Sequence, residues 1–288
     1  MARDGGEVAR IRGCDGGAWR GRGGPVSLEY APVPFLSPAV QRGFGFFETA
    51  LLVGRRAVLW EPHLDRMHRI LSGLDLPKPS RGRLDAAAKN ALDASPAKLA
   101  EQRALRLTWF AVGEDLDDPA SYRLEAHLMP IPESRLARRS GSHSVSLPLD
   151  LQRDTPGVKS TSYFAAIQGG RLAVKAGGDE GLFRSPDGSY LEGTTTGLAA
   201  WNGGTPLLAP KGVLPSVTAA AFFGGRSASA PLKAENLREG SILLGSLTMA
   251  TPILTLDGAP CARPPEMLAR IAEFNRRLLE DPAFGTEL

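Results

Sequence analysis

The most reactive group that the sequence offers is a lysine between a loop and a predicted helix. Lys159 follows Pro156 and Gly157 and precedes a helix that we expect to begin near Ser162. An amine on the flexible lysine stem can lose its proton when it is desolvated, and it can then form a Schiff base with a carbonyl compound. A solvated lysine would suit the same local sequence, so other residues must decide between the two interpretations.

Two further segments could bind the ends of an anionic, carbonyl-bearing molecule. Glu192 follows a short apolar strand, where a carboxylate can hold the proton of a pyridinium ring or simply lie at the surface. The segment Leu214–Thr218 leads into a predicted helix, whose first backbone N–H groups suit a phosphate or only a helix cap. Gly245–Thr248 could add hydroxyl groups, and Arg66 is either a solvated charge or a phosphate clamp.

Several other chemistries lack the motifs that they need. The sequence holds no G-x-x-x-x-G-K-[ST] nucleotide loop, no H-E-x-x-H zinc motif and no G-x-S-x-G esterase turn. Gly43 and Gly45 begin a dinucleotide-like pattern, but Glu48 occupies the place of its third glycine. Ser95 and Lys98 match S-x-x-K without its companion motifs, which we attribute to chance. We expect no metal site, because no metal-ligand spacing connects the four histidines, which we interpret as structural or exposed: His63, His68, His127 and His143.

The elements that must position these residues begin with a small sheet and two helices. Alternating and helical spacing of apolar residues predicts strands at 46–53 and 57–60, helices at 62–76 and 83–92, and strands at 105–110 and 122–129. Pro62 suits a first helical position, and Pro77 ends the same pattern. Pro130–Pro132 then interrupts the chain, so we place a domain boundary there.

The second half of the chain predicts a larger domain. Its expected elements are a strand at 144–149, a helix from 162 to 176, hairpins at 181–191 and 198–208, a helix at 218–223, strands at 242–244 and 253–256, and a final helix at 267–278. We therefore predict an α+β fold in two domains. Residues 1–130 would form a smaller N-terminal α/β domain, 131–140 an interdomain loop, and 141–288 a larger C-terminal domain.

Composition and charge restrict the partners of the protein. Among 288 residues, 42% are hydrophobic and 23% are charged, which is typical of a globular protein and not of a disordered chain. The balance of 34 basic and 31 acidic residues leaves a net charge of +3. This weak charge and the short basic run Arg135–Arg139 argue against nucleic-acid binding. Ser and Thr interrupt the longest apolar run, Ser241–Leu256, so we expect no membrane span.

The cysteines and the first 24 residues indicate the cellular compartment in which we expect the protein. Cys14 and Cys261 are the only cysteines, and two lone thiols suit a reducing compartment, so we expect a cytoplasmic protein. The first 24 residues hold eight Gly and five Arg and lack the apolar region of a secretory signal. We expect the first residues to be a disordered tail or the result of a misassigned start site.

Several segments, taken in order, resemble one enzyme family. The second half carries them at residues 159–163 (K-S-T-S-Y), 176–180, 187–188, 191–194 (L-E-G-T) and 212–218 (G-V-L-P-S-V-T). In the first half, Gly43–Thr49 and Glu61–Arg66 are similar to a strand and a helix opening of the same family. The resemblance runs from about residue 40 to 256 and is to the class IV aminotransferases, the fold type IV pyridoxal-phosphate enzymes. It implies a two-domain α+β fold with pyridoxal 5′-phosphate bound between the domains.

The resemblance implies a role for each matching residue. Lys159 would form the Schiff base with the cofactor and move the Cα proton of the substrate, and Glu192 would pair with the pyridine nitrogen. Tyr163 would border the ring or its hydroxyl, whereas Arg106 and Leu247 would contact the substrate, with a solvent-side strand arginine as the alternative for Arg106. The cofactor phosphate would be bound by Arg66, Val217, Thr218 and Ser246. The family also implies a homodimer with its sites near the subunit interface and a small amino-acid-like substrate.

The sequence departs from the family pattern at three positions and leaves the reaction open. Ser162 stands where Asn is frequent, Gly197 replaces an Asn, and Phe44 replaces an Asp, which puts the tuning of the ring and the identity of the substrate in doubt. The compact length and the Phe-Glu-Thr sequence that ends at Thr49 favour an aminodeoxychorismate lyase, which releases pyruvate and 4-aminobenzoate. The alternatives are a branched-chain or D-amino-acid transaminase, or a cofactor-binding protein without turnover.

Overall fold

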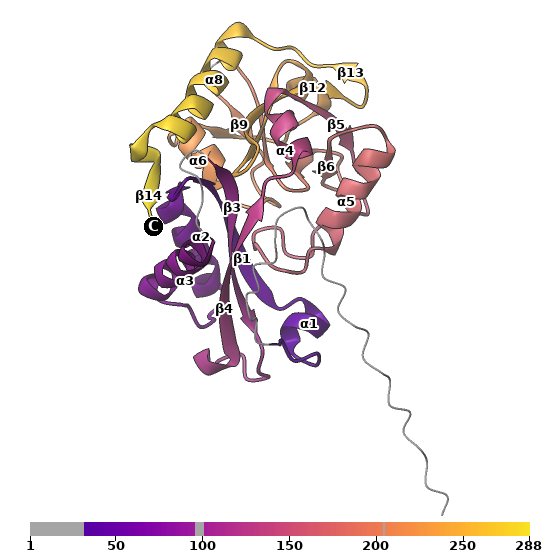
Figure 1. Cartoon of the computed structure of the whole chain (residues 1–288). Helices are drawn as coiled ribbons and strands as arrows, with labels where there is room; N and C mark the ends of the chain where they lie inside the picture. The colour runs from indigo at the N-terminus through magenta and orange to yellow at the C-terminus, as the bar shows by residue number, and fades with distance from the viewer. Residues whose placement is uncertain (1–31, 96–100, 204) are drawn as a thin grey trace, which may run out of the picture. The chain divides into compact units, whose positions relative to one another are not determined.

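The strand pair predicted around Gly54 lies within a five-stranded antiparallel sheet (Figure 1). The computed structural model describes residues 32–95, 101–203 and 205–288. The strand order in this sheet is β14–β2–β1–β3–β4, so β1 is central. The strands are β1 (Gly45–Val53), β2 (Arg56–Val58), β3 (Gln102–Ala111), β4 (Tyr122–Pro130) and β14 (Gly285–Glu287).

Two helices bury one face of this sheet. They are α2 (Trp60–Gly73) and α3 (Arg81–Ala94), and the N-cap of α3 is Ser80, whose hydroxyl accepts the Arg83 N–H at 3.3 Å. Apolar side chains at helical spacing, including Leu64, Met67 and Leu71, pack with Trp109 of β3 in one core. The start predicted at Pro62 is wrong, because α2 begins at Trp60 and proline is also tolerated within the first turn.

The second half of the chain forms a larger mixed sheet of nine strands. Its order is β10–β9–β8–β11–β12–β5–β6–β7, and β13 pairs with β12. The predicted hairpins are confirmed as the antiparallel pairs β6–β7 and β8–β9. The strands are β5 (Ser142–Ser146), β6 (Glu180–Arg184), β7 (Tyr190–Gly193), β8 (Gly197–Ala200), β9 (Leu207–Leu208), β10 (Ala228–Ser229), β11 (Ser241–Gly245), β12 (Met249–Leu256) and β13 (Ala259–Pro260).

The helices of the second half were predicted except for the shortest. The expected helices are present as α5 (Phe164–Lys175), α6 (Val217–Phe223) and α8 (Pro265–Glu280), whose apolar stripe is buried. The strand predicted at 144–149 is wrong at its end, because β5 stops before Pro148, which has no N–H for the ladder. Short elements without a full apolar period were missed: α1 (Pro38–Arg42), α4 (Glu133–Ala137), α7 (Ala234–Arg238), the 3₁₀ turn at Arg138–Ser140 and strands β10, β13 and β14.

One core joins the two sheets. Leu51 of β1 and Ala104 of β3 pack with Phe222 of α6, Leu244 of β11 and Met249 of β12. Residues 33–288 therefore form one compact unit, and the division at 131–140 remains our proposal for its two lobes. The predicted tail, Cys14 and most of the segment from Ser95 to Lys98 lie outside the described residues.

The last residues of the chain return to the first sheet. Strand β14 pairs with β2, and the Leu59 N–H donates to the Phe284 carbonyl at 2.8 Å. Buried Arg56 of β2 donates to the carbonyls of Leu278, Leu279 and Asp281, at 3.1, 2.6 and 3.3 Å. These carbonyls belong to the last turn of α8, which has no helical donors for them. Arg56 thus attaches the end of α8 to the N-terminal sheet.

We expect Arg56→Met to lower the free energy of unfolding by about 2 kcal/mol or more, because buried helix-end carbonyls lose a charged donor. Urea titration followed by circular dichroism would measure the change. Arg276→Met is the matched control, because Arg276 makes only exposed ion pairs on the same helix and its loss should not be measurable. Equal midpoints for Arg56→Met and the wild type would contradict this account.

Candidate active site

Strand β1 positions Lys159, which lies more than a hundred residues later in the chain. The Phe47 N–H donates to the Lys159 carbonyl at 3.0 Å, and the Thr161 N–H donates to the Gly45 carbonyl at 2.8 Å. Position 45 needs a glycine, because a Cβ there would lie 2.9 Å from the Thr161 hydroxyl oxygen. The Lys159 amine is 4.5 Å from the centre of the Phe47 ring. The first sheet therefore fixes the reactive amine predicted from the sequence.

The electrostatic surroundings of Lys159 favour its neutral amine. Burial of the amine and the charge of Arg66 lower the pKa of Lys159 to about 7, although Glu48 acts in the opposite direction. Arg153 and Arg106 add to the lowering of this pKa. A substantial fraction of the amine is consequently unprotonated at neutral pH and able to attack a carbonyl carbon.

Glu48 is the buried acid that holds two neighbouring basic side chains. It accepts from Nε and Nη2 of Arg66 at 2.7 and 2.6 Å, and from Nδ1 of His63 at 2.8 Å. Burial raises the pKa of Glu48, but the paired Arg66 and then His63 outweigh this effect and lower the pKa to about 2. Burial also lowers the pKa of His63 against the effect of Glu48. Because Glu48 can only accept, the neutral His63 ring carries its hydrogen on Nδ1.

Arg66 lines a small polar cavity, and so do the other residues that were predicted to bind a phosphate. Its Nη1 donates to the Pro215 carbonyl at 2.9 Å, just before α6. Arg66, Val217, Thr218 and Ser246 all line this cavity of about 50 Å³, together with Lys159 and Glu192. Ser216 caps α6 by accepting the Ala219 N–H at 3.1 Å, so the N–H groups of Val217 and Thr218 lie in the first helical turn without helical acceptors. The structure thus brings together a guanidinium, hydroxyls and backbone donors that suit a phosphate.

Glu192 also lines this cavity, and its carboxylate is already paired. Its buried carboxylate accepts from Arg153 at 2.7 Å and from the Leu214 N–H at 3.0 Å. Burial raises the pKa of Glu192, and the ion pair with Arg153 opposes that rise. A carboxyl group with a raised pKa can share a proton with a ring nitrogen, so this geometry suits the predicted role of Glu192.

A second cavity of about 270 Å³ adjoins the first and is lined by both predicted substrate residues. Arg106 and Leu247 line it with Lys159, Tyr163 and Thr49. Arg106 of β3 and Thr49 of β1 are paired in the register of these adjacent strands. The Arg106 guanidinium lies 3.8 Å from the centre of the Phe47 ring. Tyr163 packs edge to face on Phe47, with 5.4 Å between ring centres. The two cavities share Lys159 and Tyr163, so the amine lies where a cofactor site and a substrate site would meet.

Glycines and unpaired hydroxyls shape the cavities for a bound group. A Cβ at Gly193 would overlap the Thr196 hydroxyl oxygen, and a Cβ at Gly245 would lie 2.8 Å from the Thr248 hydroxyl oxygen. The buried hydroxyls of Thr196 and Thr248 have no hydrogen-bond partner in the described part of the chain. Close backbone approach together with polar atoms that lack partners is the chemistry that a phosphorylated ring compound requires.

At each of the three positions that depart from the family pattern, the structure shows specific local contacts. A Cβ at Gly197 would lie 2.9 Å from the Ser216 Cβ, so the cap of α6 occupies the space of a larger side chain. The Ser162 hydroxyl donates to the Asp154 carboxylate at 3.1 Å. Phe44 packs edge to face on Phe46 and against the core of the first sheet. None of these arrangements displaces Lys159 or Glu192.

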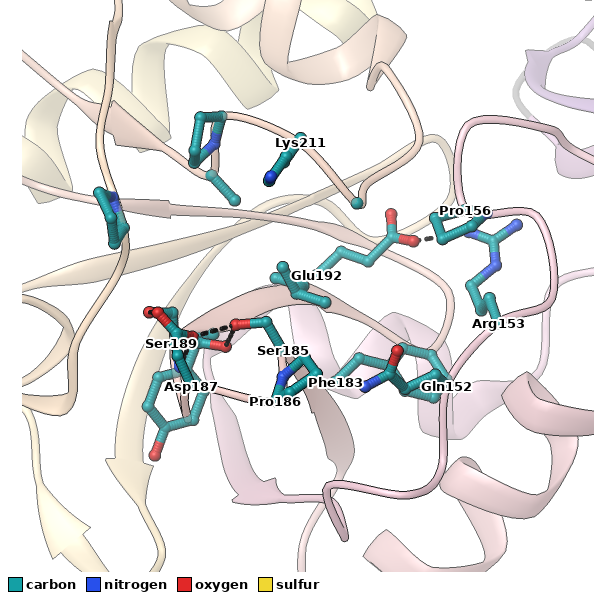
Figure 2. A pocket seen from close by; sticks show the side chains of 16 residues that line it. Gln152, Arg153, Pro156, Phe183, Ser185, Pro186, Asp187, Ser189, Glu192 and Lys211 are labelled. Carbon is teal, nitrogen blue, oxygen red and sulfur yellow. Dashed lines mark hydrogen bonds and ion pairs between the residues drawn. The ribbon is translucent and has the colours of Figure 1, made fainter.

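A cavity larger than these two lies on another side of Glu192. It has a volume of about 500 Å³ and mainly apolar walls, and Lys159 does not line it. Figure 2 shows this cavity, with Glu192 reaching Arg153 at its edge and Lys211 on another wall. We place the chemistry in the smaller cavities, because they contain the reactive amine.

The sequence did not identify Glu48, His63 or Arg153 as members of the site. Glu48 was noted only as an interruption of a glycine pattern, although it lies in the segment that resembles the family. His63 and Arg66 are three residues apart, a spacing that places both on one helix face and could have indicated a shared partner. Among the residues that the structure describes, no group of three or more His, Cys, Asp or Glu side chains could hold a metal ion.

Comparison with known proteins identifies relatives across most of the chain. Residues 45–256 match the family described as amino-transferase class IV. The chain is 31% identical over 263 residues to a bifunctional aminodeoxychorismate lyase / D-amino acid transaminase from Mycobacterium tuberculosis. The match covers 82% of this chain and 90% of that protein.

Solved structures share the fold over similar lengths. A hypothetical aminotransferase from Mycobacterium tuberculosis in its PLP-bound form has a TM-score of 0.76 and 25% identity, over 88% of this chain and 95% of that one. The branched-chain amino acid aminotransferase from Escherichia coli has a TM-score of 0.70 and 19% identity, over 85% and 88% of the two chains. The second likeness concerns the fold alone.

We expect Glu48→Gln to lower the free energy of unfolding by about 3–5 kcal/mol at pH 7, because Arg66 is left buried without its counter-charge. The loss should shrink as the pH falls from 5 towards 2, because the wild-type stabilisation requires the ionised carboxylate. Denaturant titrations across this pH range would measure both effects. Glu273→Gln, which removes an exposed ion pair, is the control. A loss in Glu48→Gln that does not vary with pH would contradict the ion-pair explanation.

We expect the Lys159 amine of the cofactor-free protein to titrate near pH 7. Competitive labelling with a trace amine reagent, followed by quantitative peptide mass spectrometry, would give the pH midpoint of its reactivity. Nα-acetyl-lysine in the same tube provides the reference for a solvated amine. A Lys159 midpoint equal to that of the reference would contradict the desolvated, positively surrounded environment described above.

Proposed function

Because the chain belongs to the class IV aminotransferase family, it is a pyridoxal-phosphate-dependent enzyme, and we propose that it converts aminodeoxychorismate to 4-aminobenzoate and pyruvate. The observation that carries the proposal is the similarity over 82% of the chain to a relative named for the lyase and D-amino-acid transaminase reactions. Family membership argues against the hypothesis of a binding protein without turnover. Thr49, the residue that favoured the lyase, lines the substrate cavity and is the cross-strand neighbour of Arg106.

The residues of the small polar cavity fit the cofactor. Arg66, Ser246 and the N–H groups of Val217 and Thr218 would bind its phosphate, and Glu192 would meet its ring nitrogen. Tyr163 would border the ring, and Lys159 would attach to its carbonyl carbon. When bound, pyridoxal phosphate withdraws the electron pair that remains on a substrate carbon after loss of a proton.

We propose that Lys159 moves the protons of the reaction. In the lyase reaction, it would take the proton from the substrate carbon that bears the amino group. The bond between the ring and the enolpyruvyl oxygen then breaks, and the ring becomes aromatic. A proton returned to the methylene carbon of the released enolpyruvate gives pyruvate, so no oxidant or second substrate is required. Arg106 and Leu247 would position the substrate on the other side of the amine.

A transaminase is the second candidate, because the same relative is also named a D-amino acid transaminase. Both reactions begin when Lys159 takes a proton from the carbon that bears the amino group. They differ in where Lys159 returns that proton, because a transaminase delivers it to a cofactor carbon and then requires a keto acid as amino acceptor. Lys159, Glu192 and Arg106 would have the same roles in the lyase reaction and in the transaminase reaction.

A homodimer is the assembly that we propose for the active enzyme. Helix α5 exposes Phe164, Ile167 and Val174, with 76%, 59% and 66% of each residue accessible, which is unusual for large apolar side chains on one helix. Ile167 also lines a cavity beside Tyr163. A second copy that covers this helix would therefore lie close to the proposed site.

The proposed location is the cytoplasm. No helix in the described part of the chain is both long and apolar enough to cross a membrane. Cys261, the cysteine that the structure describes, is a buried free thiol, which suits a reducing compartment.

We expect the cofactor-loaded protein to release equimolar 4-aminobenzoate and pyruvate from aminodeoxychorismate, because both products come from one bond cleavage. Chromatography and a coupled lactate dehydrogenase assay would quantify them. Lys159→Ala should abolish both products and the visible absorbance band of the lysine-bound cofactor.

The transaminase is tested in parallel with L- and D-amino acids and 2-oxoglutarate. Formation of keto acid without any 4-aminobenzoate would overturn the lyase proposal. A wild-type protein without a visible cofactor band would contradict the cofactor roles of Lys159 and Glu192.

A further inference from the structure

The short basic run Arg135–Arg139 lies beside the proposed substrate cavity. It occupies α4 and the following 3₁₀ turn, directly after the proline-interrupted end of β4. Two of its three arginines have structural partners. Arg139 donates to the Leu247 carbonyl at 3.0 and 2.7 Å. Arg138 pairs with buried Glu180 at 3.3 Å.

Arg135, the third arginine of the run, lines the cavity of about 270 Å³ with Arg106 and Lys159. Its side chain is half-buried and makes no hydrogen bond or ion pair with any residue that the structure describes. Arg135 also lines a neighbouring cavity that contains Asp179, but no ion pair joins the two side chains, and the Asp179 carboxylate accepts the His143 N–H at 2.8 Å. Arg135 therefore lines the substrate cavity without an ion pair to any described residue.

The acids around the site are already occupied by other arginines. Glu48 pairs with Arg66, Glu192 with Arg153, and Glu180 with Arg138. Among described residues, no acidic side chain lines the cavity that contains Arg106 and Arg135. Arg106 likewise has no ion pair with a described residue, and its guanidinium lies over the face of the Phe47 ring. Two guanidinium groups without ion pairs in one cavity suit a ligand with matching negative charge.

We propose that Arg135 binds a second carboxylate of the substrate, so that Arg106 and Arg135 together select molecules with two carboxylates. A guanidinium suits this role because its planar donors match the two oxygens of a carboxylate. The inference rests on the proposed function, because it takes the cavity beside Lys159 as the substrate site. Aminodeoxychorismate carries two carboxylates, whereas branched-chain amino acids carry one.

The test uses unreactive ligands and the cofactor-loaded protein. Linear dicarboxylates from succinate to adipate are titrated beside monocarboxylates of the same chain length, from butyrate to hexanoate. Binding is followed by the absorbance of the bound cofactor. The variants are Arg135→Gln, Arg106→Gln and the control Arg276→Gln, which removes an exposed charge on α8 outside both cavities.

Wild-type protein should bind the best dicarboxylate at least about tenfold more tightly than its monocarboxylate partner. Arg135→Gln should weaken dicarboxylate binding about 10- to 100-fold and leave monocarboxylate binding unchanged, which also shows that the variant is folded. Arg106→Gln should weaken the binding of both kinds of ligand, and Arg276→Gln should weaken neither. With aminodeoxychorismate, Arg135→Gln should raise KM far more than it lowers kcat.

Equal weakening of both ligand kinds in Arg135→Gln, or of neither, would overturn the assignment. A changed oligomeric state with unchanged affinities would place Arg135 at a subunit contact and would also overturn it. A failure of the lyase proposal can be distinguished from a failure of this assignment. A wild-type protein that selects dicarboxylates through Arg135 but forms no 4-aminobenzoate would retain this inference and lose that proposed function.

Discussion

The buried ion pair between Glu48 and Arg66 is the interaction on which the rest of the site depends. Several cations surround one desolvated amine, and burial of an unpaired charge would cost several kcal/mol. Glu48 compensates Arg66 and at the same time orients His63, whose Nε2 lies 3.3 Å from the Ser246 hydroxyl. One carboxylate on β1 therefore fixes Arg66, which lines the proposed phosphate cavity, and His63, which contacts Ser246 of that cavity. It also leaves Arg66 close enough to lower the pKa of Lys159.

The pairing of acids with arginines divides the site into regions of different charge. The pair between Glu192 and Arg153 places a carboxylate at one end, where a ring nitrogen would need an acceptor. Arg66 and the donors of α6 lie at another end, where a phosphate would need donors. The substrate side retains positive charge, because its arginines have no acidic partners in the described residues. Lys159 lines both cavities, so under the proposed function one amine would reach both the cofactor and the substrate.

Sequence patterns predicted the local elements better than the partners of the site residues. Apolar periodicity identified the main helices and the two hairpins, because burial of one face dictates that spacing. Resemblance to the family identified Lys159, Glu192 and Arg66, whose segments are contiguous. It did not indicate that Glu48 holds Arg66 or that Arg153 holds Glu192, since those contacts join residues 18 and 39 positions apart. Helix α4 was missed because five residues between prolines and a 3₁₀ turn show no apolar period.

A crystal structure of the cofactor-loaded protein would test the central claim most directly, because the claim concerns which charge meets which end of the cofactor. The account predicts a phosphate within hydrogen-bond distance of Arg66, Ser246 and the Thr218 N–H, with the Glu48 pair intact. It also predicts the ring nitrogen at Glu192 and a bond from Lys159 to the cofactor carbon. A phosphate bound instead at Arg106 and Arg135, or a ring nitrogen away from Glu192, would contradict it.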